Sequence, residues 1–178
     1  MSGHNRWTQI KRQKESVDAK KSKVFSKLSR NISVEAKLAG GKDSPGLRAA
    51  IEKAKKVNMP KDVIDRAVKK GSEPSESLEA ITYEAYGPGG AGLIIEALTD
   101  SRNRTAQEIK HLFAKNGFAL GGMGSVTWAF AKENTPEGVI WKPNTAVSLS
   151  DEDLELLEQM VDELEDNDDV QEVYTNAE

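Results

Sequence analysis

The spacing of apolar residues changes once along the chain, and this change limits the fold more than any other feature. Up to residue 71 apolar side chains recur every three or four positions, which is the period of amphipathic helices. From residue 80 onward, short runs typical of strands alternate with helical stretches. The polar segment SEPSESLE lies between them. We therefore predict a helical domain at 1–71, a linker at 72–79 and an α/β domain at 80–178.

Three helices are predicted in the first domain. The stretch 16–39 places its apolar residues on one arc of the helix and its basic residues nearly opposite. Ser44 followed by Pro45 is typical of a helix start, and a third helix is expected from Pro60 to a stop at Gly71. Helices of this length with one apolar face form a small bundle.

The second domain reads as a mixture of strands and helices. Strands are expected at 81–86, 93–98, 125–131, 139–149 and 170–175, and helices at 102–116 and from the capping box of Ser150 and Asp153. Without the leading strand this order is βαββαβ, the ferredoxin-like order, in which helices cover one face of an antiparallel sheet. The predicted fold class is therefore α+β.

Charge is divided between the two halves, although the net charge is only −4. Residues 1–70 hold nineteen Lys and Arg against seven Asp and Glu, whereas the remainder holds six against twenty-two. Such asymmetry indicates an anionic partner for the first half. The alternative is that both charged faces are simply solvated.

Cations in the first half are the candidate nucleic-acid-binding residues, because ammonium and guanidinium groups pair with phosphates and release counterions. The set, with one aromatic residue in the N-terminal arm, is Arg6, Trp7, Lys11, Arg12, Lys14, Lys20, Lys23, Lys27, Arg30, Lys37, Lys55, Lys56, Lys69 and Lys70. No helix shows the polar side chains that read base edges, so the sequence indicates phosphate contact without base readout.

A second anion site is predicted where a strand passes into a helix at residues 99–105, TDSRNRT. Arg102, Asn103 and Arg104 would surround an anion at the N-terminus of that helix. The alternative is that Asp100 or Ser101 caps the helix while the arginines are solvated or paired with acids.

Several chemistries find no support in the sequence. With no cysteine there is neither a disulfide nor a thiolate site, and two histidines far apart do not suggest a metal centre. The G-x-G-x-x-G pattern at 87–92 precedes a strand instead of a helix, which favours a hairpin turn over a dinucleotide site. We predict no catalytic residue, cofactor or metal. No apolar run approaches a membrane span or a secretory leader, so a cytoplasmic protein is expected.

Long stretches of the chain, in order, resemble the YebC/PmpR family, which includes the mitochondrial translational activator of cytochrome c oxidase subunit I. The matching segments are GHNRW (3–7), DAKKSKVFSKLSRNI (18–32), LRAAIEKAKKVNMPKD (47–62), YGPGGAGLIIEALTDSRNRT (86–105) and GSVTWAF (124–130). Relatives carry an additional small α/β domain between the positions of Phe130 and Trp141, where this chain has only ten residues.

The resemblance implies a DNA-binding transcriptional regulator, with a translation factor bound to RNA at the ribosome as the alternative. Two other classes stay open. One is a small enzyme that holds a phosphate with Arg102 and Asn103 on a ferredoxin-like scaffold, although fold alone does not license that transfer. The other is a protein-interaction module whose acidic helix at the C-terminal end docks a basic partner. The sequence leaves the oligomeric state open.

Overall fold

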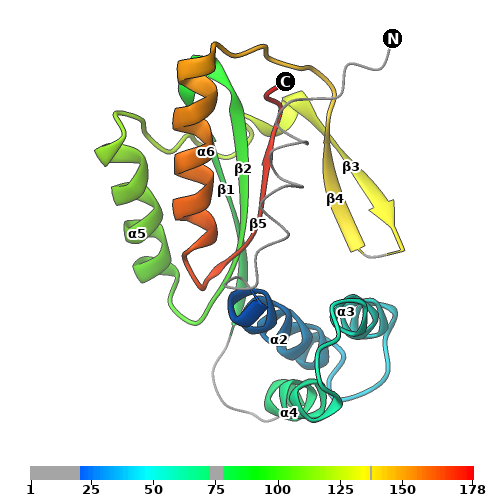
Figure 1. Ribbon diagram of the computed structural model, residues 1–178. Helices are drawn as coiled ribbons and strands as arrows, with labels where there is room; N and C mark the ends of the chain where they lie inside the picture. Colours follow the sequence, from blue (N-terminus) through cyan, green and yellow to red (C-terminus); the bar gives the residue numbers. More distant parts are fainter. Residues whose placement is uncertain (1–20, 73–77, 137) are drawn as a thin grey trace.

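The computed structural model describes residues 21–72, 78–136 and 138–178, in which helices come first and antiparallel sheets follow (Figure 1). This arrangement confirms the predicted α+β class. The helices of the first part and the sheet of the second have separate hydrophobic cores.

The helical unit consists of α2 (Lys21–Leu38), α3 (Pro45–Lys56) and α4 (Lys61–Ser72). Its core contains Leu28, Ile32, Leu47, Ala54 and Ile64. As predicted, Ser44 caps α3, since its hydroxyl accepts the Leu47 N–H at 3.1 Å. Gly71 allows α2 and α4 to pack closely, because a Cβ there would lie 2.1 Å from the Ser33 carbonyl oxygen.

A three-stranded sheet forms the centre of the α/β unit. Its strands are β1 (Glu79–Tyr86), β2 (Gly92–Thr99) and β5 (Val170–Thr175), in the order β1-β2-β5 with both pairs antiparallel. The predicted turn between β1 and β2 is confirmed. Gly89 and Gly90 adopt φ of 61° and 80° there, a region that glycine enters without strain.

The two faces of this sheet are covered differently (Figure 1). Helices α5 (Arg102–Lys115) and α6 (Asp151–Glu165) pack on one face, where Phe113 and Leu157 meet strand residues such as Ile95. The other face packs against a short helix, Thr127–Ala129, and the hairpin of β3 (Phe130–Thr135) and β4 (Gly138–Pro143). The Ser150 cap of α6 is confirmed, with the Asp153 N–H donating to its hydroxyl at 3.1 Å.

The strand pairing differs from the ferredoxin-like order. The expected strand at 125–131 begins only at Phe130, and β3 pairs with β4 in a separate hairpin instead of joining the main sheet. The physical reason is that β1 and β5 already occupy both edges of β2, which leaves no edge of that strand for another partner. Of the expected strand at 139–149, residues after β4 contribute only an isolated bridge between Val147 and Ala177.

Glu84 explains why residues 124–127 turn instead of extending. Its buried carboxylate accepts the N–H groups of Gly124 at 2.7 Å, Val126 at 2.7 Å and Thr127 at 2.9 Å. Burial raises the pKa of this carboxyl, but the three backbone donors outweigh burial and leave the pKa below its usual value. Glu84 is therefore a buried anion that fixes a loop.

We expect Glu84→Gln to lower the free energy of unfolding by about 2–3 kcal/mol, because the amide keeps one acceptor oxygen and turns a donor toward the remaining N–H groups. Chemical denaturation measures this loss. The matched control is Glu79→Gln, an exposed position on the same strand, which should change stability by less than about 1 kcal/mol. Equal losses in the two variants would contradict the anchoring role.

Candidate nucleic-acid interface

A groove of about 480 Å³ runs between α2 and α4 and reaches the edge of the α/β unit at Leu78 and Asp100. Phe25 and Val63 line it together with Ser26 and Ser29. Four cations also line the groove: Arg30, Lys37, Arg66 and Lys70. The groove therefore combines apolar walls with a concentration of positive charge.

The structure brings some of the predicted phosphate-binding residues together and separates others. Lys37 and Lys70 both line the groove. Lys69 is exposed on α4, and Lys55 and Lys56 are exposed on α3, where Lys55 pairs with Glu52 at 2.8 Å. Lys27 is half-buried on α2, and Lys23 lies in the first turn of that helix. Outside the described residues are Arg6, Trp7, Lys11, Arg12, Lys14 and Lys20.

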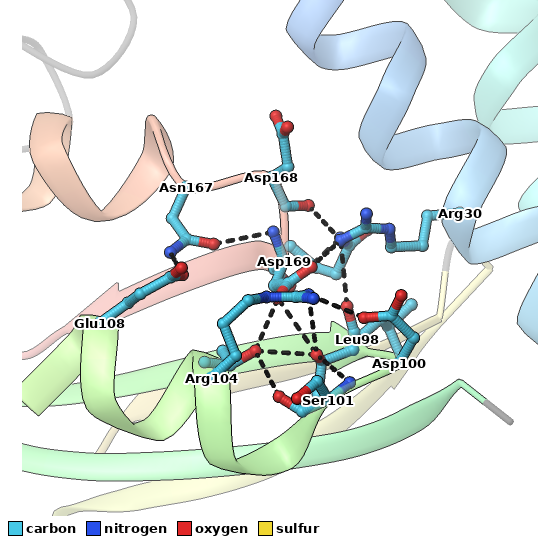
Figure 2. A network of polar contacts seen from close by, with 12 residues as sticks. Arg30, Leu98, Asp100, Ser101, Arg104, Glu108, Asn167, Asp168 and Asp169 are labelled. Atoms are coloured by element: carbon cyan, nitrogen blue, oxygen red, sulfur yellow. Dashed lines mark hydrogen bonds and ion pairs between the residues drawn. The ribbon is translucent and has the colours of Figure 1, made fainter. Parts of the chain in front are cut away.

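Arg30 departs from the expectation that it faces phosphates. From α2 its guanidinium reaches across to the α/β unit, where it pairs with the Asp169 carboxylate and donates to the Asp168 carbonyl at 2.8 Å (Figure 2). It also donates to the Leu98 carbonyl at 3.3 Å. Part of the basic face predicted for the helix at 16–39 thus lies against the sheet instead of facing solvent. Arg30 links the helical unit to the α/β unit.

Asp169 is the centre of this contact. Its side chain is only 4% exposed, and besides Arg30 it accepts hydrogen bonds from Thr105 at 2.6 Å, Arg104 at 2.8 Å and Thr99 at 3.1 Å. Burial raises the pKa of Asp169, but the hydrogen bonds from Thr105 and Arg104 and the charge of Arg30 outweigh burial and lower it. The carboxylate is therefore ionised and paired at neutral pH.

Two of the three residues of the predicted second anion site, Arg102 and Arg104, have acidic partners. Arg104 pairs with Asp169 and also with Asp100 at 2.7 Å (Figure 2), and Arg102 lies 3.5 Å from the carboxylate of Glu79. Asn103 is exposed on the first turn of α5. In the alternative interpretation Asp100 or Ser101 caps the helix while the arginines are solvated or paired with acids. The structure shows both arginines beside acids, whereas the Ser101 side chain makes no capping hydrogen bond.

Most residues that line the groove were not predicted from the sequence. The lining positions 26, 29, 33 and 37 of α2 and 63, 66, 67 and 70 of α4 each follow helical spacing, so each set lies on one helix face. The helical spacing of both sets could be recognised in the sequence. The spacing does not show that the two faces border the same groove, because this depends on the close packing of α2 and α4 at Gly71.

Over residues 21–72, 78–136 and 138–178, no group of three or more His, Cys, Asp or Glu side chains could hold a metal ion. Within the same ranges, no helix has the length and apolar character needed to cross a bilayer.

The fold and the groove together define an α+β protein in which a cation-rich helical unit contacts an acidic sheet unit through the Arg30–Asp169 ion pair. The sequence matches two family descriptions, the "TACO1/YebC protein N-terminal domain" over residues 5–74 and the "TACO1/YebC second and third domain" over 78–135 and 132–177. The chain belongs to the TACO1/YebC family, as its motifs predicted.

Curated relatives match along almost the whole chain. A protein of Fervidobacterium nodosum is 39% identical over 235 residues, covering 99% of this chain and 93% of the relative. One of Petrotoga mobilis is 45% identical over 183 residues, covering 100% of this chain and 71% of the relative. Both are named "Probable transcriptional regulatory protein". The crystal structure of the conserved hypothetical protein Aq1575 from Aquifex aeolicus has a TM-score of 0.81 at 32% identity, covering 92% of this chain and 93% of that one.

The alignments also bear on the additional domain expected between Phe130 and Trp141. The match to the Fervidobacterium nodosum relative spans 235 residues, whereas this chain has 178, so the relative has further residues within the aligned region. The family match breaks into two segments that meet at 132–135, inside β3. In this chain the β3–β4 hairpin occupies the corresponding position.

Proposed function

We propose that this protein is a nucleic-acid-binding regulator of gene expression that contacts phosphates through its helical unit. The observation that carries the proposal is the segregation of charge in the fold. Exposed cations cover α3 and α4, whereas α6 presents a row of carboxylates on its exposed side and carries no base. A polyanion is attracted to the first surface and repelled by the second.

The names of the relatives support regulation of transcription, and DNA is accordingly the first partner to test. The exposed cations of α3 and α4 include Arg48, Lys53, Lys61 and Lys69. Side chains of this kind position a protein on the backbone of a nucleic acid without reading its bases. Since phosphates are shared by DNA and RNA, ribosomal RNA is the second partner to test.

A regulatory function also fits the arrangement at Arg102 better than phosphate chemistry does. An enzyme of the acylphosphatase kind needs arginines that converge on its substrate, whereas Arg104 is held by two carboxylates and leaves Arg102, loosely paired with Glu79, as the one accessible arginine of the segment. The family's names likewise describe regulators.

The proposal is tested by competition at fixed salt among native promoter DNA, scrambled promoter DNA and ribosomal RNA. We expect little discrimination between the two DNA duplexes, and we expect structured RNA to compete at least as well, because contacts to phosphates carry no sequence information. A preference of about a thousandfold for one promoter would contradict the proposed mode, since that ratio requires direct or shape-based readout. Absence of binding to all three would contradict the proposed function itself.

A further inference from the structure

We propose that the groove between α2 and α4 binds one unpaired nucleotide of a single-stranded nucleic acid. The inference rests on the proposed function for its partner class and adds the form of nucleic acid that the protein prefers. It concerns the groove lined by Phe25, Val63 and Leu78 on its apolar side and by Lys37, Arg66 and Lys70 on its cationic side.

The shape and chemistry of the groove suit a nucleoside. Its volume of about 480 Å³ falls within the range of small-molecule sites, roughly 300–1,000 Å³. Phe25 and Val63 line the groove where they also pack against the core of the helical unit, and Leu78 adds further apolar lining. Aromatic side chains stack on the face of any unpaired base, whereas a base inside a duplex has its faces covered by neighbouring bases.

The charges at the groove suit the phosphates on either side of such a base. Lys70 is exposed on α4, one helical turn from Arg66. Arg66 pairs with Asp62 at 3.0 Å, but both side chains are more than 70% exposed, so a phosphate can replace this weak partner. Arg30 also lines the groove, with its guanidinium bound to Asp169.

One acid, Asp100, lies at the edge of the groove and opposes an anion there. Its carboxylate is paired with Arg104 at 2.7 Å, which offsets its charge. The hydroxyls of Ser26 and Ser29 complete the lining and can donate to phosphate or sugar oxygens. The groove is thus an apolar slot with cations at its border, which is the pattern of sites for single strands.

The test compares a single-stranded RNA, a single-stranded DNA of the same sequence and the corresponding DNA duplex, by fluorescence anisotropy at one salt concentration. The double variant S26L/S29L fills the groove with aliphatic side chains and leaves every charge in place. We expect it to weaken binding of both single strands about tenfold or more and to change duplex binding by less than about twofold. The matched control, Q107L/A114L, adds the same side chains at exposed positions of α5 and should bind as the wild type does.

A second variant, Phe25→Leu, keeps an apolar wall but removes the ring, and we expect it to weaken single-strand binding at least about fivefold while circular dichroism stays unchanged. Wild-type affinity for single strands in both folded variants would overturn the inference and leave the proposed function intact. Equal weakening of single strands and duplex would also overturn it, because the groove would then serve backbone contact in general. If wild-type protein binds none of the three nucleic acids, that result contradicts the proposed function itself and, with it, this inference. A difference between the RNA and DNA strands would identify which of them the groove prefers.

Discussion

Asp169→Asn should lower the free energy of unfolding by about 2–4 kcal/mol, because it removes the charge of a buried carboxylate whose arginine partners are partly exposed. The carboxylate accepts from Thr99, Thr105 and Arg104 through one oxygen and from Arg30 through the other. An asparagine of the same shape turns an NH₂ group toward one of these sets of donors. It thereby removes the negative charge between two guanidinium groups.

The control for Asp169→Asn is the same substitution at the neighbouring residue, Asp168. The Asp168 side chain is exposed, and only its backbone carbonyl accepts from Arg30, so Asp168→Asn should change stability by less than about 0.5 kcal/mol. Urea denaturation of both variants measures the difference. Similar stabilities for the two variants would show that the contact between the units contributes little to folding.

The contribution of Asp169 to stability should depend on pH. Since the pKa of Asp169 is lowered in the folded state, its contribution to stability is complete above the unfolded-state pKa of about 3.9 and is lost as pH falls through the folded-state pKa. The difference in unfolding free energy between wild type and Asp169→Asn should therefore be constant near neutral pH and shrink below about pH 4. A difference that grows on acidification would have the wrong sign for this mechanism.

Features that depend on neighbouring residues were predictable from the sequence. Ser44 and Ser150 cap helices because their hydroxyls accept hydrogen bonds from backbone N–H groups only three positions further along the chain. The turn at 87–90 followed from local glycine content in the same way. The placement of β3 and β4 was not predictable, because it depends on which strands occupy the edges of β2, and strand periodicity does not identify pairing partners.

The candidate site shows the same division between local and distant information. That Arg30 lies on the polar face of an amphipathic helix follows from spacing, and a solvated or phosphate-bound cation was the natural interpretation. Its partner Asp169 is 139 residues away, in the turn before the last strand, and nothing in the sequence links the two. Lys37 and Lys70 likewise belong to separate helices of the predicted bundle, and only the packing of α2 on α4 makes them line one groove.

Reversing the charge of three exposed lysines of α4 should weaken duplex DNA binding by about 10²–10³-fold at 0.1 M salt. The triple variant is K61E/K69E/K70E, and none of these side chains has an ion pair among the described residues. Each lost phosphate contact should also reduce the slope of log affinity against log salt by about 0.9. If all three lysines contact phosphates, the slope therefore falls by roughly 2.7.

A control of equal net charge separates local contact from general repulsion. K110E/K132E/K142E makes the same change on exposed lysines of the α/β unit, and we expect its affinity to fall far less and its salt slope to stay close to that of the wild type. Measuring slopes as well as affinities matters, because long-range repulsion weakens with added salt whereas a lost contact changes the number of counterions released. If the two variants lose affinity equally with the same slope, net charge governs binding and the helical unit is not the contact surface. If only the control loses affinity, the contact surface lies on the α/β unit.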